Sequence, residues 1–197
     1  MLEMLTVCAI AVTLIAVSVM VLMPLYQKNH VDRAYDMTLS VLRTYRNMAI
    51  TQYTRYIITV PTSQTITVQN WAFPPTGSTV APAPVTVATI NLPQDIQFTT
   101  QAGFPNPGPD SFGTGTTAVA FNACAILASG NPCVIFYPDG SAQDDASVPG
   151  NYNNGVVYLA LPGQLYSSRA IDIWGTTGRI RGWRLYSVSG VNTWVQQ

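Results

Sequence analysis

An uncharged, apolar stretch runs from Met4 to Gln27, directly after a single acidic residue, Glu3. At about 1.5 Å per residue, a helix of this length crosses a bilayer core of about 30 Å. We therefore predict that residues 1–27 form the transmembrane half of an N-terminal helix. A carboxylate at its end is costly in lipid, so Glu3 is expected to meet a partner there.

The predicted helix continues without a break as an amphipathic half over residues 28–57. Apolar and aromatic residues recur there in steps of three and four, which makes a stripe along one side of the helix. The stripe consists of Val31, Ala34, Tyr35, Thr38, Val41, Leu42, Tyr45, Met48, Ala49, Tyr53 and Tyr56. Such a stripe needs a surface to lie on, so we expect the helix to pack against the rest of the chain. It should end at about Tyr56, because the β-branched run Ile57–Val60 follows.

Residues 58–197 are predicted to form a β-rich head. Short runs suited to strands alternate there with turn clusters such as Pro138-Asp139-Gly140. The predicted strands are Thr65–Gln69, Val85–Ile90, Ile96–Thr99, Ala118–Asn122, Cys133–Tyr137, Val156–Leu161, Ala170–Ile173, Arg179–Tyr186 and Thr193–Val195. No helix-period segment interrupts them, so we predict an α+β fold in which an antiparallel sheet or sandwich packs on the long helix.

The chain carries few charges, and they are unevenly spread. Charged residues make up 9% of the 197 residues, and the formal net charge is zero. Between Lys28 and Tyr56 five basic residues face two acidic ones, whereas from Ile57 onward four arginines face six aspartates. This balance excludes a broadly basic nucleic-acid-binding protein.

Cys124 and Cys133 flank a segment with Gly130, Asn131 and Pro132 that is typical of a turn. The spacing suits a disulfide that closes a small loop, which requires an oxidising compartment. Two separate buried thiols are the alternative. The chain has no CxxC pair, so we predict no metal site at these cysteines.

Two parts of the sequence resemble a known family. LEMLTVCAIAVTLIAV resembles the N-terminus of type IV pilins and type II secretion pseudopilins. VIFYPDGSA, followed by VVYLAL and IDIWGTTGRIR, resembles the C-terminal strands of the FimT/GspH family of minor pilins. The resemblance covers residues 1–30 and 133–182, and it implies a pilin-like fold and a structural subunit rather than an enzyme.

The N-terminus departs from the family pattern. Pilin precursors carry a short basic leader, which a prepilin peptidase removes before the new N-terminus is methylated. Glu3 matches the family's glutamate, which implies that the leader and two mature residues precede Met1 and that the start codon is assigned too late. An unprocessed chain is the alternative. Without the leader, Lys28 and Arg33 would hold the head in the cytoplasm by the positive-inside rule.

The resemblance implies that Glu3 acts in filament assembly. Its carboxylate would pair with the N-terminal ammonium of a neighbouring subunit, which neutralises two charges that are unfavourable in lipid. The alternative is an interfacial glutamate at the level of the lipid headgroups.

Arg179, Arg181 and Arg184 are the candidate DNA-binding residues. Gly178-Arg179-Ile180-Arg181 matches the G-R-x-R element with which FimT-like pilins of competent bacteria bind DNA. Residues two apart on a strand share a face, so Arg179 and Arg181 are expected to contact phosphates together, in salt-sensitive binding. The alternative is the solvated polar face of an edge strand.

Two further groups of residues carry weaker hypotheses. Asp139, Asp144 and Asp145 offer oxygen ligands for calcium, but their spacing does not match an EF-hand, and we predict a hairpin turn there. His30, the one histidine, is expected to be a solvated side chain of the helix, far from any nucleophile. We therefore predict no catalytic residues, no enzyme activity and no cofactor.

The sequence thus predicts a minor pilin or minor pseudopilin, a structural component of a type IV pilus or a type II secretion pseudopilus. It would be a single-pass protein of the inner membrane with its head in the periplasm or on the extracellular filament. Its partners would be membrane lipid and other pilins, through helix packing. The alternatives are a DNA-binding minor pilin for DNA uptake and an unprocessed, membrane-anchored β-domain.

Overall fold

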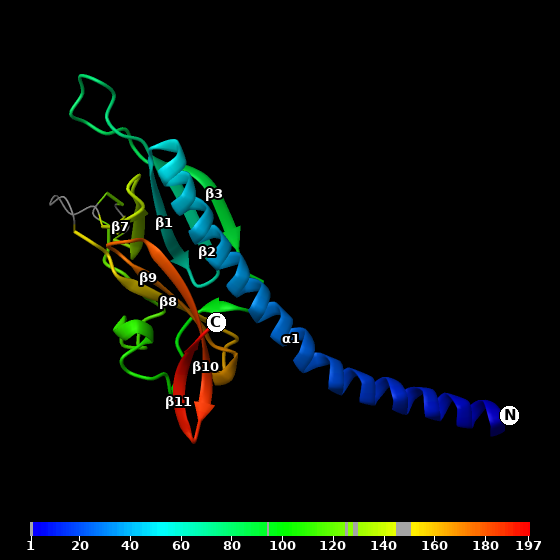
Figure 1. Ribbon diagram of the computed structural model, residues 1–197. Helices are drawn as coiled ribbons and strands as arrows, with labels where there is room; N and C mark the ends of the chain where they lie inside the picture. The colour runs from blue at the N-terminus through cyan, green and yellow to red at the C-terminus, as the bar shows by residue number, and fades with distance from the viewer. Residues whose placement is uncertain (1, 94, 125, 128–129, 145–150) are drawn as a thin grey trace.

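The computed structural model describes residues 2–93, 95–124, 126–127, 130–144 and 151–197; within the long helix, the described side chains are 3, 4, 6–18 and 29–52. One continuous helix, α1 (Leu2–Gln52), opens the chain. Its later half lies against the β-rich head, whereas its earlier half extends away from the head (Figure 1). The predicted unbroken helix and the α+β class are confirmed.

The predicted end of the helix at Tyr56 is wrong. Helix α1 ends at Gln52, and Tyr53 adopts a left-handed backbone with φ of 50°. The amide of Thr54 then donates to the carbonyl of Ala49 at 3.2 Å, which closes the last turn. The β-branched run begins strand β1 (Arg55–Thr62) instead, because it pairs with a strand on each side.

The first sheet contains five antiparallel strands in the order β3-β2-β1-β6-β7. Besides β1, its strands are β2 (Thr65–Trp71), β3 (Val85–Asn91), β6 (Cys133–Phe136) and β7 (Ala142–Gln143). Strands β1 and β7 are not among the predicted ones. The antiparallel pairing itself is confirmed, since every pair in this sheet is antiparallel.

The second sheet has the order β11-β10-β9-β8-β4, and a further short strand, β5, pairs with β8. Its strands are β4 (Gln97–Phe98), β5 (Val119–Ala120), β8 (Gly155–Ala160), β9 (Arg169–Trp174), β10 (Arg179–Val188) and β11 (Val191–Gln196), and two 3₁₀ turns lie beside it, η1 (Pro109–Ser111) and η2 (Leu165–Ser167). Strands β4 and β5 are shorter than predicted, because only two residues of each pair with β8.

The main core lies between α1 and both sheets. Helix α1 contacts β1 and β6 of the first sheet and β8, β9 and β10 of the second. The predicted stripe is confirmed where Val31, Ala34, Leu42 and Ala49 are buried, but it is wrong at Tyr53, which lies beyond the helix and is 77% exposed. Because the helix spans two sheets, its amphipathic half is the element that joins them.

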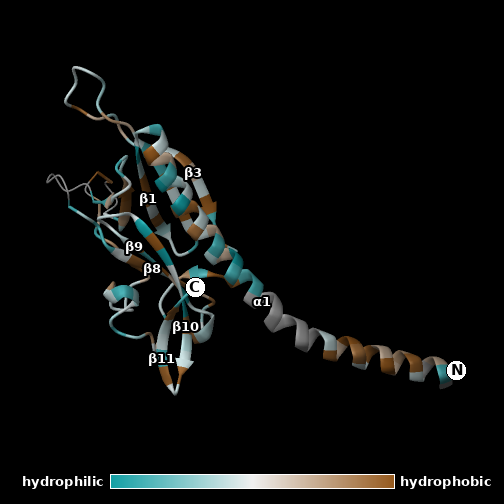
Figure 2. Ribbon diagram, in the orientation of Figure 1, coloured by the Kyte–Doolittle hydropathy of each residue, from teal (hydrophilic) through white to brown (hydrophobic). Residues whose placement is uncertain are grey.

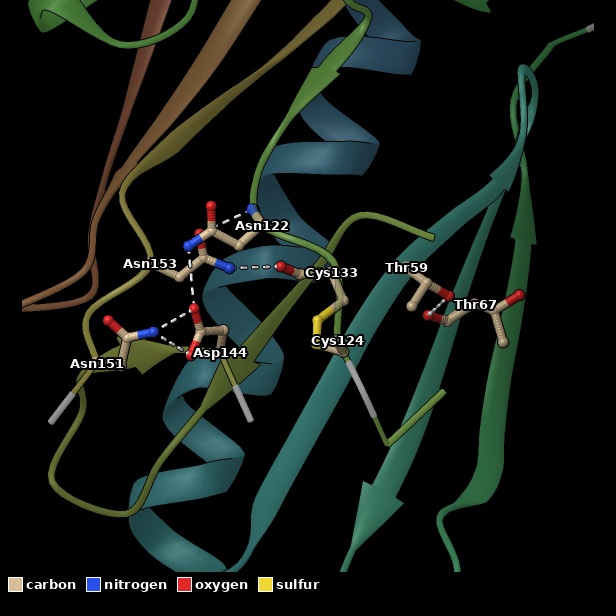
Figure 3. Close-up of a disulfide and its surroundings, with 8 residues drawn as sticks. All are labelled: Thr59, Thr67, Asn122, Cys124, Cys133, Asp144, Asn151 and Asn153. Carbon is tan, nitrogen blue, oxygen red and sulfur yellow. Dashed lines mark hydrogen bonds between the residues drawn. A yellow bond between two sulfur atoms is a disulfide. The ribbon is translucent and has the colours of Figure 1, made fainter. Parts of the chain in front are cut away.

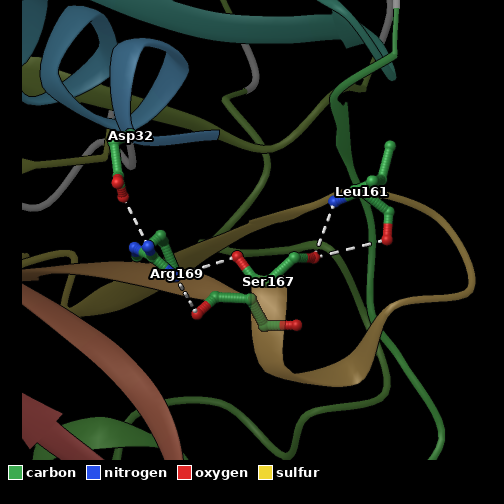
Figure 4. A network of polar contacts seen from close by, with 5 residues as sticks. Asp32, Leu161, Ser167 and Arg169 are labelled. Carbon is green, nitrogen blue, oxygen red and sulfur yellow. Dashed lines mark hydrogen bonds and ion pairs between the residues drawn. The ribbon is translucent and has the colours of Figure 1, made fainter. Parts of the chain in front are cut away.

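An ion pair between the buried Arg169 and the partly exposed Asp32 links the helix to the second sheet. Arg169 at the start of β9 is 1% exposed, and its guanidinium donates to Asp32 of α1 and to the carbonyl of Ser167 (Figure 4). Burial lowers the pKa of Arg169, whereas the Asp32 carboxylate raises it. The helix therefore meets the sheet through a charge pair as well as through apolar packing.

Cys124 and Cys133 form a disulfide on the far side of the first sheet, which confirms the predicted bridge (Figure 3). Both cysteines are buried beside Ile57, Trp71 and Ile135. The bridge ties the loop after β5 to the first residue of β6.

Replacing both cysteines by alanine is expected to lower the free energy of unfolding by about 2.5 kcal/mol, since the bridge closes a loop with a sequence separation of nine residues. Urea unfolding of the full chain in mild detergent measures the change. Cys8→Ala is the matched control, because Cys8 is exposed and unpaired. An unchanged unfolding midpoint after reduction of the native chain would contradict the prediction.

Candidate functional site

The N-terminal half of α1 exposes apolar side chains on every side. Met4, Val7, Ile10, Val12, Leu14, Ile15 and Val17 are each 60–76% exposed. At about 100° per residue, these positions cover an arc of about 220° around the helix axis, much wider than one stripe. The exposed Ala9 and Ala16 lie in the remaining sector. Figure 2 shows this half in the hydrophobic colours, apart from the head. An apolar helix surface of this extent requires an apolar environment or neighbouring helices to cover it.

No helix built from the described residues is both long and apolar enough to cross a membrane. The transmembrane segment over residues 1–27 therefore stays a prediction.

Glu3 lies in the first turn of α1 with its side chain exposed. Its carbonyl accepts a hydrogen bond from Thr6 Oγ1 at 2.8 Å. A negative charge at this end is favourable for the helix dipole. The head lies at the opposite end of the helix, so its described residues do not reach this carboxylate (Figure 1).

The three candidate DNA-binding arginines all lie in β10, but their surroundings differ. Arg179 is exposed, whereas Arg181 is 20% exposed and donates to Asp110 at 2.6 Å. Arg184 stacks on Tyr186, with 5.1 Å between its guanidinium carbon and the ring centre. Arg179 is thus the most exposed of the three, and the DNA-binding role of Arg179, Arg181 and Arg184 stays a prediction.

Arg181 belongs to a cluster of carboxyls between β9, β10 and η1. Asp110 also accepts from Trp174 Nε1 at 2.9 Å, and Asp172 lies directly across the strand pair from Arg181. The Asp172 side chain is fully buried, and neither of its carboxyl oxygens forms a hydrogen bond of regular geometry. The Asp172 carboxyl nevertheless interacts with the Asp110 carboxyl. The sequence did not indicate this cluster, because Asp110 comes from a loop some sixty residues before the strands.

The two carboxyls differ in charge. Burial raises the pKa of Asp172 to about 7, and the neighbouring Asp110 adds to the rise. Burial also acts to raise the pKa of Asp110, but its contacts with Asp172, Trp174 and Arg181 together hold it below the ordinary value. Asp110 is thus the anion that binds Arg181, and Asp172 holds a proton into the neutral range.

A polar groove lies between α1 and the turn that joins β9 to β10. It has a volume of about 500 Å³ and is lined by Arg43, Arg46, Asn47, Thr177, Gly178, Arg179 and Ile180. Arg46 is held in place by two carbonyls, that of Gly140 at 3.1 Å and that of Thr177 at 2.9 Å. Gly178 has φ of 58°, and a Cβ there would lie 2.0 Å from the Gly140 oxygen, so only glycine allows this approach.

The expected turn at Pro138-Asp139-Gly140 is confirmed, since β6 and β7 form a hairpin around it. Asp139 accepts from the amide and the hydroxyl of Ser141, at 2.9 and 2.6 Å. Asp144 accepts from the side-chain amides of Asn122 and Asn151 (Figure 3). Asp145 lies outside the described residues. Both described carboxylates are thus bound by protein donors, as in a structured turn.

His30 is not a solvated side chain, and that prediction is wrong. Its Nδ1 lies 2.9 and 3.0 Å from the two carboxylate oxygens of Asp95, in the loop between β3 and β4. The pair fixes the middle of α1 to the head at a level near the Asp32–Arg169 ion pair. Local sequence patterns could not predict this contact, because sixty-five residues separate His30 from Asp95.

No protein-family model and no curated protein matches the sequence. Among solved structures, the chain is similar to the type IV minor pilin FimU of Pseudomonas aeruginosa (strain PAO1), with 15% sequence identity and a TM-score of 0.41. The similar region covers 80% of this chain and 90% of that one. Values this low do not assign the chain to a family.

Proposed function

We propose that this chain is a filament subunit of the pilin type, a minor pilin or minor pseudopilin. One observation carries the proposal, namely that a single helix holds the head with its later half and exposes an apolar surface on all sides of its earlier half. Such a helix end suits two successive environments, the lipid of a membrane and the helix bundle of a filament.

Assembly would transfer the apolar half from lipid to neighbouring helices. Lipid tails are as apolar as these side chains, so close packing and polar pairs would drive the transfer. Glu3 supplies the polar pair in this scheme, because a neighbour's N-terminal ammonium would neutralise a carboxylate that lipid disfavours. The continuous helix transmits this placement to the head, which then selects the neighbouring subunits.

The proposal places the chain in the inner membrane as a single-pass protein, with the head in the periplasm or on the filament. It includes a processed, methylated N-terminus. Mass spectrometry of the N-terminus from native membranes tests this part. If the native chain begins at Met1, the alternative of an unprocessed, membrane-anchored β-domain replaces the filament subunit.

Replacing Glu3 by alanine is expected to leave the protein in the membrane fraction and to lower its amount in sheared filaments at least about tenfold, which corresponds to the loss of about 1.4 kcal/mol of pairing energy. Immunoblots of membranes and of sheared filaments measure the two pools. Thr13→Ala, on the same exposed helix half, is the matched control and should assemble normally. Normal assembly of the Glu3 variant would remove the role of this carboxylate.

DNA uptake is not proposed as a second function. Arg181 pairs with Asp110 and Arg184 lies against Tyr186, so only the sequence motif supports that function.

A further inference from the structure

A loop that packs against the second sheet is held in a backbone conformation that is unfavourable for its own residues. The η1 loop, residues 108–113, contains Asp110 and Ser111 in sequence, with φ of 49° and 65°. Neither residue is glycine, and a left-handed backbone brings a Cβ close to the next carbonyl oxygen. Such residues keep this conformation only where the surrounding structure fixes them. Contacts with the sheet must therefore hold the η1 loop in place.

The Asp110 carboxylate makes the polar contacts of the η1 loop with β9 and β10. Its Oδ2 accepts from Arg181 at 2.6 Å and from Trp174 Nε1 at 2.9 Å. The ring of Phe112 meets the ring of Trp174 with 5.1 Å between the ring centres. The side chains of Arg181 and Asp110 are 20% and 16% exposed, so water screens this ion pair only in part. The pairing of Arg181 with Asp110 therefore binds the loop to the sheet.

Asp172 competes with Asp110 for the same guanidinium. It lies opposite Arg181 in the pair of β9 and β10, and it is 0% exposed. Its carboxyl interacts with that of Asp110. The Nε of Arg181 is buried and has no hydrogen-bond partner among the residues that the structure describes, so this donor is left for a second carboxylate. One guanidinium thus lies beside two carboxyls, and it neutralises one of them at a time.

Three further polar groups face Asp172 or the η1 loop, and they carry no charge at neutral pH. Tyr35 approaches Asp172 from α1, and burial raises the pKa of its phenol. Tyr158 of β8 donates to a carbonyl of the loop at 3.4 Å, and burial raises its pKa to about 12. Trp183 of β10 adds an indole N–H, which does not titrate. Arg181 is thus the cation that acts on Asp172.

We propose that these three side chains form a pH-dependent switch, in which Arg181 exchanges Asp110 for Asp172 and the η1 loop leaves the sheet. While Asp172 is protonated, Arg181 neutralises Asp110 and the loop stays bound. When Asp172 loses its proton to water, a second negative charge lies beside the first, and one guanidinium does not neutralise both. Burial raises the pKa of Asp172 to about 7, so this proton is lost in the neutral range.

Asp110 is the group that moves in this switch. Asp172 is held in β9, which pairs with β8 on one side and with β10 on the other. Asp110 lies in a loop whose left-handed residues become free to relax on release. Arg181 lies opposite Asp172, so the two can pair without a movement of either strand. The switch belongs to the head alone and does not rest on the filament role.

Hydrogen exchange of the full chain in mild detergent tests the switch. The amides of Ser111 and Phe112 donate to the carbonyls of Gly108 and Pro109 at 3.1 and 2.9 Å, so they are protected while the η1 loop keeps its bound conformation. Their protection factors are corrected for the intrinsic dependence of exchange on pH. A pKa of about 7 in the bound state and of about 3.9 in the released state gives an expected fall in protection of about tenfold between about pH 6 and about pH 8.

Three variants separate the exchange of partners from other causes. Asp172→Asn is neutral at every pH, so the protection of the loop amides should no longer depend on pH. Asp110→Asn should give low protection at both pH values, because Arg181 then pairs with Asp172 throughout. Ser111→Gly relieves one left-handed residue and should raise the protection about threefold at both values, with the tenfold fall retained. Asp36→Asn is the control and should behave as the native chain, since that carboxylate is exposed on α1.

The amides of β1 are the reference within the same chain, because β1 lies in the first sheet. Local release requires that the loop amides be less protected than those of β1 and less sensitive to urea. Equal protection and equal urea dependence would mean that the loop opens only with the whole head, which would overturn the switch. A tenfold fall that persists in Asp172→Asn or in Asp110→Asn would overturn it as well. So would protection that stays constant between the two pH values in the native chain.

Discussion

Replacing Gly182 by alanine is expected to lower the free energy of unfolding by more than about 3 kcal/mol, the upper end of overpacking costs. Gly182 lies in β10, directly beneath the buried ring of Tyr35 on α1. A Cβ at this position would lie 1.5 Å from the Tyr35 hydroxyl oxygen and 2.6 Å from the ring carbon that bears it. Either the Tyr35 ring would have to leave its buried position or the helix would have to move away from the second sheet. Urea unfolding of the full chain in mild detergent measures the loss.

Two further variants separate the steric clash from other effects. Tyr35→Phe removes the nearest atom, so the double variant with Gly182→Ala should regain part of the lost stability. Gly163→Ala is the control, because nothing lies within 4 Å of a Cβ there and only its positive φ of 80° is unfavourable. That control should cost about 1 kcal/mol. Equal losses for both glycines would show that the approach of Tyr35 is not tight.

Replacing Asp172 by asparagine is expected to stabilise the protein above pH 7 and to flatten its dependence on pH. The native pKa of about 7 lies above the ordinary unfolded value of about 3.9, so the native state binds more protons between these values. Stability is therefore highest below pH 4 for this group and falls as the pH rises to 7. At about 1.4 kcal/mol per pKa unit, the loss amounts to at most about 4 kcal/mol.

Unfolding curves between pH 4 and pH 8 measure this dependence. The pKa of Asp110 is lowered, so this group stabilises the protein above pH 4 and its contribution is lost only as the pH falls below 4. Its effect therefore lies outside the range from pH 4 to pH 8. Asp36→Asn is the control, since that carboxylate is exposed on α1. If the free energy of unfolding of the Asp172→Asn variant still falls between pH 4 and pH 7, the pH dependence belongs to another group.

Local patterns in the sequence predicted the elements that depend on near neighbours. The three-and-four spacing from Val31 to Ala49 located the buried side of α1, since a helix repeats every 3.6 residues. The turn between Cys124 and Cys133 predicted the bridge. The same patterns misplaced the end of the helix, because the strand at Ile57–Val60 is stabilised by partners far along the chain.

The sequence by itself determined the long helix with its two unlike halves and the antiparallel class of the head, because both depend on periodicity. It also favoured the disulfide, through the short spacing of the two cysteines, over two separate thiols. Only the tertiary structure decided which charges meet. It binds Arg181 to Asp110 across 71 residues, brings Arg46 to Thr177 across 131, and joins Asp32 to Arg169 across 137. The two contacts of α1 form because the helix lies across both sheets, and Arg181 meets Asp110 because the η1 turn lies beside β9. No local pattern encodes which distant residue each side chain will face.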